Sequence, residues 1–122
     1  MLDKEGPIDI CVLGLGANGH LALNEPAEQL QPFVHVARLT AESCQHPMLA
    51  ESAARPSYGL TIGMADILQS RKVLLLVSGV HKREQFQRLL SRQVSTQFPA
   101  SFLWLHPDVT CLCDRDAKGA DE

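Results

Sequence analysis

The chain has 122 residues, enough for one domain and too few for two, and its 45% hydrophobic and 20% charged residues are ordinary for a globular protein. A net charge of -3 and an isoelectric point near 5.9 argue against a nucleic-acid or membrane-surface partner. No apolar run approaches the ~20 residues that span a bilayer, and residues 1–5 lack the pattern of a secretory signal. We therefore expect a cytoplasmic protein.

Short apolar runs separated by glycine, proline and polar segments predict strands that alternate with helices. In chain order the predicted elements are a strand at Ile8–Leu13, a loop at Gly14–Pro26, a strand at Phe33–Leu39, a short helix within Thr40–Ala54, a strand at Tyr58–Ile62, a helix at Gly63–Leu68, a strand at Lys72–Val77, a helix at Val80–Arg92, and strands at Phe102–Leu105 and Val109–Cys113. The charged tail, Asp114–Glu122, is expected to fray. This alternation indicates one α/β layered domain.

The strongest strand pattern is Lys72–Val77, whose continuous apolar character is typical of a parallel strand covered on both faces. The helix that follows is amphipathic and is predicted to direct Phe86, Leu89 and Leu90 inward. The chain enters the strand Ile8–Leu13 with no preceding helix to cover the sheet. We therefore expect an α/β domain that is truncated at its N-terminal side.

The cysteines are Cys11, Cys44, Cys111 and Cys113, and three of them lie inside apolar runs, where a reduced cysteine packs as a small hydrophobe. Cys111 and Cys113 would share one face of a strand, which could bring two thiols together. A zinc site needs about four ligands at recognisable spacings, and the sequence has neither CxxC nor a histidine pair at i, i+4. We expect packing roles for the cysteines, no metal site and no organic cofactor.

A glycine pattern, GxGxxG at Gly14–Gly19, directly follows the first predicted strand. In a dinucleotide-binding domain this pattern opens a long helix whose N-terminus points at the pyrophosphate. Here Pro26 arrives seven residues after Gly19, so the segment between them is too short for that helix. The sequence disfavours dinucleotide binding.

The same loop carries several polar side chains directly after a buried strand, where α/β sheets place their sites. Asn18, His20, Asn24 and Glu25 can hydrogen-bond or transfer protons, and histidine is the natural proton shuttle near neutral pH. Glu25 is five residues beyond His20, so only an irregular turn would bring its carboxylate to the imidazole. The structural alternative is that His20 and Asn18 satisfy loop backbone groups while Glu25 is solvated; the density of polar groups favours a site.

The loop sequence GLGANGHLALNEP, Gly14–Pro26, resembles the signature of the glucosamine-6-phosphate deaminase family, which includes galactosamine-6-phosphate deaminase/isomerases. The resemblance continues over nearly the whole chain, through Pro56–Met64, Lys72–Gly79 with Lys82, and Trp104–Pro107. It implies a Rossmann-like three-layer α/β sheet of the deaminase type, of which this chain is the C-terminal half. It also implies conversion of an amino-sugar 6-phosphate to the ketose phosphate and ammonia.

The resemblance assigns roles to particular residues. His20 would assist opening of the pyranose ring, Glu25 would hold and tune it, and Asn18 would complete the relay without supplying charge. Lys82 would bind the substrate phosphate, although a solvated lysine in the first turn of a helix is the ordinary alternative. The remaining substrate-binding residues that we predict are Gly16, Gly19 and Asn24.

Two departures from the family pattern stand out. Many members carry a phosphate-binding arginine in the stretch that here reads Ser43–Leu49, where His46 is the nearest polar substitute. The family's general base, an aspartate, and its phosphate-gripping loop belong to an N-terminal half that this chain lacks, and neither Asp9 nor Asp66 lies in a supporting motif. The first departure is consistent with a different sugar or weaker binding, and the second leaves the activity of this chain open.

Three functions therefore stay open from the sequence. The first is deaminase/isomerase chemistry that needs the missing half, and the second is a sugar-phosphate-binding remnant without turnover. The third is a hydrolase like 6-phosphogluconolactonase, against which Asn24-Glu25-Pro26 argues. Because a truncated sheet exposes a strand, we also expect a homo-oligomer or association with a missing N-terminal half.

Overall fold

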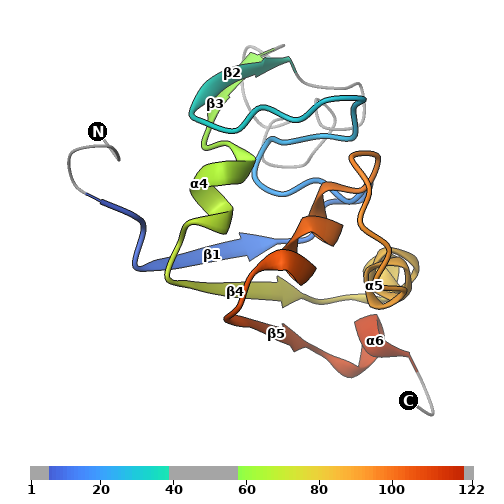
Figure 1. Cartoon of the computed structure of the whole chain (residues 1–122). Coiled ribbons are helices and arrows are strands. Elements are labelled where there is room, and N and C mark those ends of the chain that lie inside the picture. Colours follow the sequence, from blue (N-terminus) through green and yellow to red (C-terminus); the bar gives the residue numbers. More distant parts are fainter. Residues whose placement is uncertain (1–5, 39–57, 120–122) are drawn as a thin grey trace, which may run out of the picture.

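A three-stranded parallel sheet and a separate two-stranded antiparallel pair form the framework of this computed structural model, which describes residues 6–38 and 58–119 (Figure 1). The strands are β1 Ile10–Gly14, β2 His35–Arg38, β3 Tyr58–Thr61, β4 Lys72–Val77 and β5 Val109–Cys113. The helical segments are α4 Met64–Leu68, the 3-10 turn η1 Val80–Lys82, α5 Arg83–Leu90, the 3-10 helix η2 Pro99–Leu105 and α6 Arg115–Lys118. The helix predicted within Thr40–Ala54, with Cys44 and His46, lies outside the described residues.

The order of the parallel sheet is β1-β4-β5, so β4 is its central strand. Pairing runs from Ile10 opposite Lys72 to Gly14 opposite Leu76, and β5 continues the sheet from Val109 opposite Val73. Parallel strands require long crossover connections, and the segments between them carry the helices. The carboxyl ends of β1 and β4 therefore lie side by side at one edge of the sheet.

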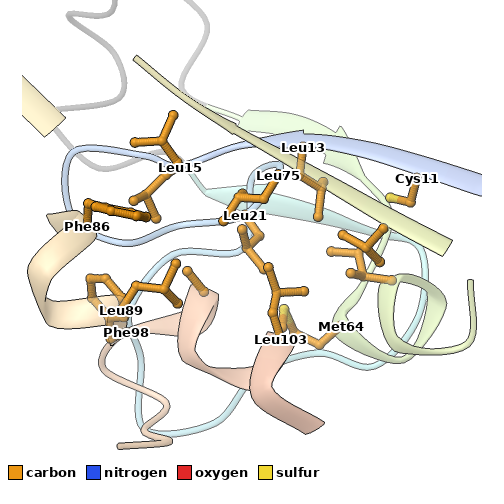
Figure 2. Packing of buried hydrophobic residues seen from close by; sticks show 14 of the residues in the cluster. Cys11, Leu13, Leu15, Leu21, Met64, Leu75, Phe86, Leu89, Phe98 and Leu103 are labelled. Carbon is orange, nitrogen blue, oxygen red and sulfur yellow. The ribbon is translucent and has the colours of Figure 1, made fainter. Parts of the chain in front are cut away.

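The core lies on one face of this sheet, where alternate residues of β1 and β4 point inward. It contains Leu13 and Leu75 from the sheet together with Ile67, Phe86 and Leu103 from α4, α5 and η2. Figure 2 shows Leu13, Leu75, Phe86 and Leu103 around Leu21, which the glycine-rich loop contributes and which is 0% exposed. The loop is therefore anchored in the core by its own apolar residue.

The other face of the sheet is not covered by the described residues. Ile10, Val12, Leu76 and Leu112 are 47–58% exposed there, although parallel sheets normally bury both faces. The α/β parallel fold predicted from the sequence is confirmed, whereas the expectation that Lys72–Val77 is covered on both faces is not met here. The helices of the described part all pack against the opposite face.

The strand predicted at Phe102–Leu105 is wrong, because this run belongs to the 3-10 helix η2. Pro99 occupies the first turn, where its fixed φ favours a helix and its missing N–H costs nothing. The Ser101 hydroxyl donates to the carbonyl of Phe98 at 2.7 Å and fixes the entry to the helix. A short apolar run alone does not distinguish a buried strand from a buried helix.

Two further expectations need correction at the carboxyl side of the sheet. Leu90, predicted to face inward, is 47% exposed on α5, while Phe86 and Leu89 are buried as expected. Of the tail predicted to fray, Arg115–Lys118 form α6, which Asp114 caps by accepting from the Ala117 N–H at 2.8 Å, while residues 120–122 lie outside the described residues. Ala117 is 0% exposed and fastens this short helix to the core.

The cysteines also depart from a uniform packing role. Cys11 is 5% exposed in the core, and burial raises the pKa of its thiol. Cys111 is exposed on β5, at the edge of the sheet, and Cys113 is partly buried. Only Cys11 is thus fully packed among the cysteines that the structure describes. No helix in the described ranges is long and apolar enough to cross a bilayer.

Gly63 gives a direct test of the packing between α4 and the segment before β2. A Cβ at this buried position would overlap the backbone of Pro32 and Phe33, and backbone cannot move aside cheaply. We expect Gly63→Ala to lower the free energy of unfolding by about 1–3 kcal/mol in urea titrations. Gly14→Ala, where a Cβ meets nothing within 4 Å, is the control and should change it by less than about 0.5 kcal/mol. Equal effects of the two substitutions would contradict this packing.

Candidate functional site

A cavity of about 410 Å³ opens at the carboxyl ends of β1 and β4. One wall is the glycine-rich loop after β1, and the other is the turn between β4 and α5. Its lining residues are Gly14, Leu15, Gly16, Ala17, Asn18, His20, Ala22, Leu76, Ser78, His81 and Lys82. This is the edge at which α/β sheets bind their ligands, as the sequence predicted for the loop.

Glycines shape the first wall so that a histidine ring can lie against the backbone. The loop closes through Gly19 N–H to Gly16 O and Gly16 N–H to His20 O, each at 3.0 Å. Gly19 has φ +89°, a left-handed conformation that favours glycine, and a Cβ there would overlap the Phe98 ring. A Cβ at Gly16 would overlap the imidazole of His20. Both glycines are therefore needed for the shape of the loop.

The polar side chains of this loop form a connected relay. The Asn18 amide donates from Nδ2 to Glu25 Oε1 at 3.0 Å, and its Oδ1 lies 2.7 Å from His20 Nδ1. Asn18 Oδ1 also accepts from the backbone N–H of His20 at 3.2 Å. Glu25 Oε1 and His20 Nδ1 are 4.0 Å apart, with side-chain exposures of 8% and 22%. The loop thus brings together the three residues that the sequence singled out for acid–base chemistry.

This relay fixes the tautomer of the neutral imidazole. An ionised carboxylate only accepts hydrogen bonds, so the NH₂ group of Asn18 must face Glu25 and its carbonyl oxygen must face the ring. That oxygen also only accepts, so His20 Nδ1 carries the proton. His20 Nε2 then holds the lone pair and can take a proton from a ligand.

An irregular turn returns the chain to Asn18, which is how Glu25 reaches the imidazole. Leu21 and Asn24 exchange backbone hydrogen bonds of 2.9 and 3.3 Å, and between them Ala22 adopts φ +53°. The Asn24 side chain is buried and donates to the carbonyls of Leu21 and Ile62 at 3.0 and 2.9 Å. The turn is therefore pinned to the residue that follows β3.

Not every predicted site residue lines the cavity. Gly16, Asn18, His20 and Lys82 do, whereas Asn24 is 3% exposed and holds the turn. Gly19 packs on Phe98, away from the lining, and Glu25 acts behind Asn18. Direct ligand contact by Asn24 and Gly19 stays a prediction, and the geometry gives both a supporting position.

The second wall carries a partly buried cation. Lys82 ends the 3-10 turn after β4, and burial lowers the pKa of its ammonium group. No carboxylate of the described residues forms an ion pair with it. A partly buried cation that borders a cavity can be stabilised by an anionic ligand, and phosphate binding by Lys82 stays a prediction.

Sequence reasoning missed three residues near the cavity. Ser78 and His81 line it, and Gln85 donates from Nε2 to the carbonyl of Ala17 at 2.5 Å, tying α5 to the glycine-rich loop. Their common signal is position directly after β4, but only the pairing of β4 with β1 shows that they face the loop. In the described ranges no group of three or more histidine, cysteine, aspartate or glutamate side chains could hold a metal ion.

Comparison with known proteins identifies the family of the chain. Residues 1–111 match the family model described as glucosamine-6-phosphate isomerases/6-phosphogluconolactonase. The chain belongs to this family. The resemblance drawn from the sequence is thereby confirmed.

Individual relatives show what share of a longer family member this chain spans. The chain is 52% identical over 113 residues to "Putative deaminase AgaI" of Escherichia coli (strain K12), covering 92% of this chain and 45% of that protein. It is 40% identical over 119 residues to glucosamine-6-phosphate deaminase 1 of Bacillus subtilis (strain 168), with coverages of 96% and 49%. The solved structure of a monomeric glucosamine-6-phosphate deaminase superimposes with a TM-score of 0.88 at 40% identity, covering 95% and 49%. The chain thus spans about half the length of the relatives it matches.

The relay makes a prediction about the ring of His20 that needs no substrate. In long-range ¹H–¹⁵N spectra of the neutral imidazole, we expect the proton on Nδ1, because Asn18 Oδ1 can only accept it. Asn18→Leu should remove this preference and let the Nε2–H form appear. A dominant Nε2–H form in the unaltered chain would contradict the relay. His35, whose Nδ1 lies 2.6 Å from the Phe33 carbonyl, is an internal reference for an Nδ1–H ring.

Proposed function

We propose that the chain carries the ring-opening and phosphate-binding part of an amino-sugar-6-phosphate deaminase/isomerase, with catalytic roles for His20, Glu25 and Asn18. The observation that supports this most is the Glu25–Asn18–His20 relay on one wall of a cavity whose other wall holds Lys82. The relatives named glucosamine-6-phosphate deaminase support the substrate class. No organic cofactor or metal enters the proposed reaction.

His20 supplies the proton transfer that opens a pyranose ring. Its Nε2 accepts the proton of the anomeric hydroxyl, the bond from the anomeric carbon to the ring oxygen breaks, and the proton passes to that oxygen. The imidazole is transiently cationic during this step. Glu25, 4.0 Å from Nδ1 and linked through the Asn18 amide, stabilises that cation and keeps the ring oriented. The relay thus favours the charged intermediate without a second proton transfer.

Lys82 binds the phosphate of the substrate in this proposal. Its ammonium lies on the wall opposite His20, so an extended sugar phosphate can reach both groups from within one cavity. Gly16 contributes close backbone approach on the first wall, while Gly19 and Asn24 maintain the loop. The proton transfer between C2 and C1 and the loss of ammonia require a base outside this relay.

A lactonase is the second candidate, because the family model spans both activities. His20 could then activate water toward a phosphosugar lactone. The Asn18 amide between Glu25 and His20 does not distinguish the two reactions, whereas the substrate does. A binding protein without turnover is the third candidate, and it needs only the cavity and Lys82.

Ammonia release tests the proposal directly. The purified 122-residue chain is incubated with glucosamine-6-phosphate and, separately, galactosamine-6-phosphate, and ammonia is measured with a coupled assay. When a polypeptide equivalent to the other half of a relative is supplied, we expect turnover of one sugar that His20→Ala lowers by about 100-fold or more, the typical contribution of a general acid–base group. His35→Ala, which alters a histidine outside the cavity lining, should leave turnover within about twofold.

The outcomes separate the candidates. Hydrolysis of 6-phosphogluconolactone without ammonia release from either amino sugar would make the lactonase the better account. Binding of the amino-sugar phosphates by a folded sample without either reaction would support the remnant. Restoration of ammonia release by a polypeptide equivalent to the other half of a relative would show that this chain needs that half.

Association through the open face of the sheet is part of this proposal. Ile10, Val12, Leu76 and Leu112 form an apolar surface, and Leu76 also borders the cavity. The monomeric deaminase that superimposes on this chain is about twice as long, so it has additional polypeptide with which to cover its own sheet. For the 122-residue chain alone, a second copy is the occupant that we propose.

Light scattering tests this association. We expect the 122-residue chain to run as a dimer or larger species, and Val12→Lys with Leu112→Lys to shift it to monomer, because two charges on an apolar interface oppose burial. Glu84→Lys, at an exposed position on α5, is the control for the added charge. A monomeric parent chain at tens of micromolar would contradict self-association through this face.

A further inference from the structure

The turn after β4 resembles the glycine-rich loop, because in both a glycine leaves room for a histidine ring. Gly79 has φ +97°. A Cβ added at Gly79 would overlap the ring of His81, because it would lie 2.6 Å from His81 Nδ1. Gly16 stands in the same relation to His20 across the cavity. Each wall therefore contains a glycine whose missing side chain lets a histidine ring lie against the backbone beside the cavity.

Resting on the proposed function, we propose that His81 is an anion-binding residue of this cavity, acting with Lys82 and Ser78 to hold the phosphate of the substrate. The three residues follow β4 within five positions, and all of them line the cavity. A hydroxyl, an imidazole N–H and an ammonium are suited to an oxyanion, because each can donate a hydrogen bond and the ammonium carries positive charge. No carboxylate belongs to the lining, so none competes with an anion there.

The backbone around His81 is held in place independently of a ligand. The Gly79 N–H donates to both carboxylate oxygens of Asp114 at 3.2 Å, and Lys82 N–H donates to Gly79 O at 3.1 Å. Asp114 is in turn the cap of α6, which packs against η1. The turn that carries His81 is therefore fastened to β5 and α6 before any substrate arrives.

His81 and Lys82 can both donate a hydrogen bond to an anion, so substitutions are needed to separate their contributions. His20 lines the same cavity on the other wall, so it must be controlled for.

Sulfate is the probe, because it is a dianion with the tetrahedral oxygens of a phosphate group. Calorimetry or ¹⁵N-resolved titration of the full chain with sodium sulfate, at fixed pH and constant ionic strength, gives the dissociation constant. We expect His81→Ala to weaken sulfate binding about tenfold, the size of one charge-assisted hydrogen bond. His81→Gln, which keeps a hydrogen-bond donor, should recover part of this affinity.

Matched variants identify the residues that bind the anion. Lys82→Ala should also weaken sulfate binding, and Lys72→Ala, at the opposite end of β4, should leave it unchanged. Unchanged sulfate affinity in His81→Ala, or an equal loss of affinity in His20→Gln, would overturn the role of His81 and leave the proposed function standing. Absence of any sulfate binding by the folded parent chain would overturn both.

Discussion

The parallel pairing of β1 with β4 is the constraint on which the site depends. Because Gly14 lies opposite Leu76, the two strands end together, and the segments that follow them become facing walls of one cavity. A slip of two residues along either strand would move one wall about 7 Å away from the other. The alternation of buried residues, with Leu13 and Leu75 on the core face, prevents a slip by one residue, since it would turn those side chains outward.

Glycines on both walls then leave room for histidine rings beside the cavity. The imidazoles of His20 and His81 lie where a Cβ of Gly16 or Gly79 would otherwise be, so each glycine leaves the space that a histidine ring occupies. On the first wall the Asn18 amide adds direction, since its two ends accept and donate differently. An aspartate at Asn18 would bring a second carboxylate close to Glu25 and lose this polarity. The Asn18 amide therefore orients the His20 ring while Glu25 supplies the only charge of the relay.

Much of this could be predicted from the sequence where local pattern and chemistry agree. The bounds of β4 at Lys72–Val77 follow from its unbroken apolar run, and the loop site follows from polar residues crowded after β1. The apolar run Phe102–Leu105 does not reveal its helical state, which depends on Pro99 and on burial beneath the sheet. The sequence does not reveal the position of His81 beside the cavity for a similar reason: only the pairing of distant strands shows which loop it faces.

The open face of the sheet connects the fold to the chemistry. Leu76 is exposed on that face and also borders the cavity, so whatever covers the apolar surface will lie next to the cavity. Burial already lowers the pKa of Lys82 with the face uncovered. Excluding water from this edge would lower the effective dielectric and strengthen the attraction between Lys82 and an anion. Anion binding in the cavity and covering of the sheet should therefore favour each other.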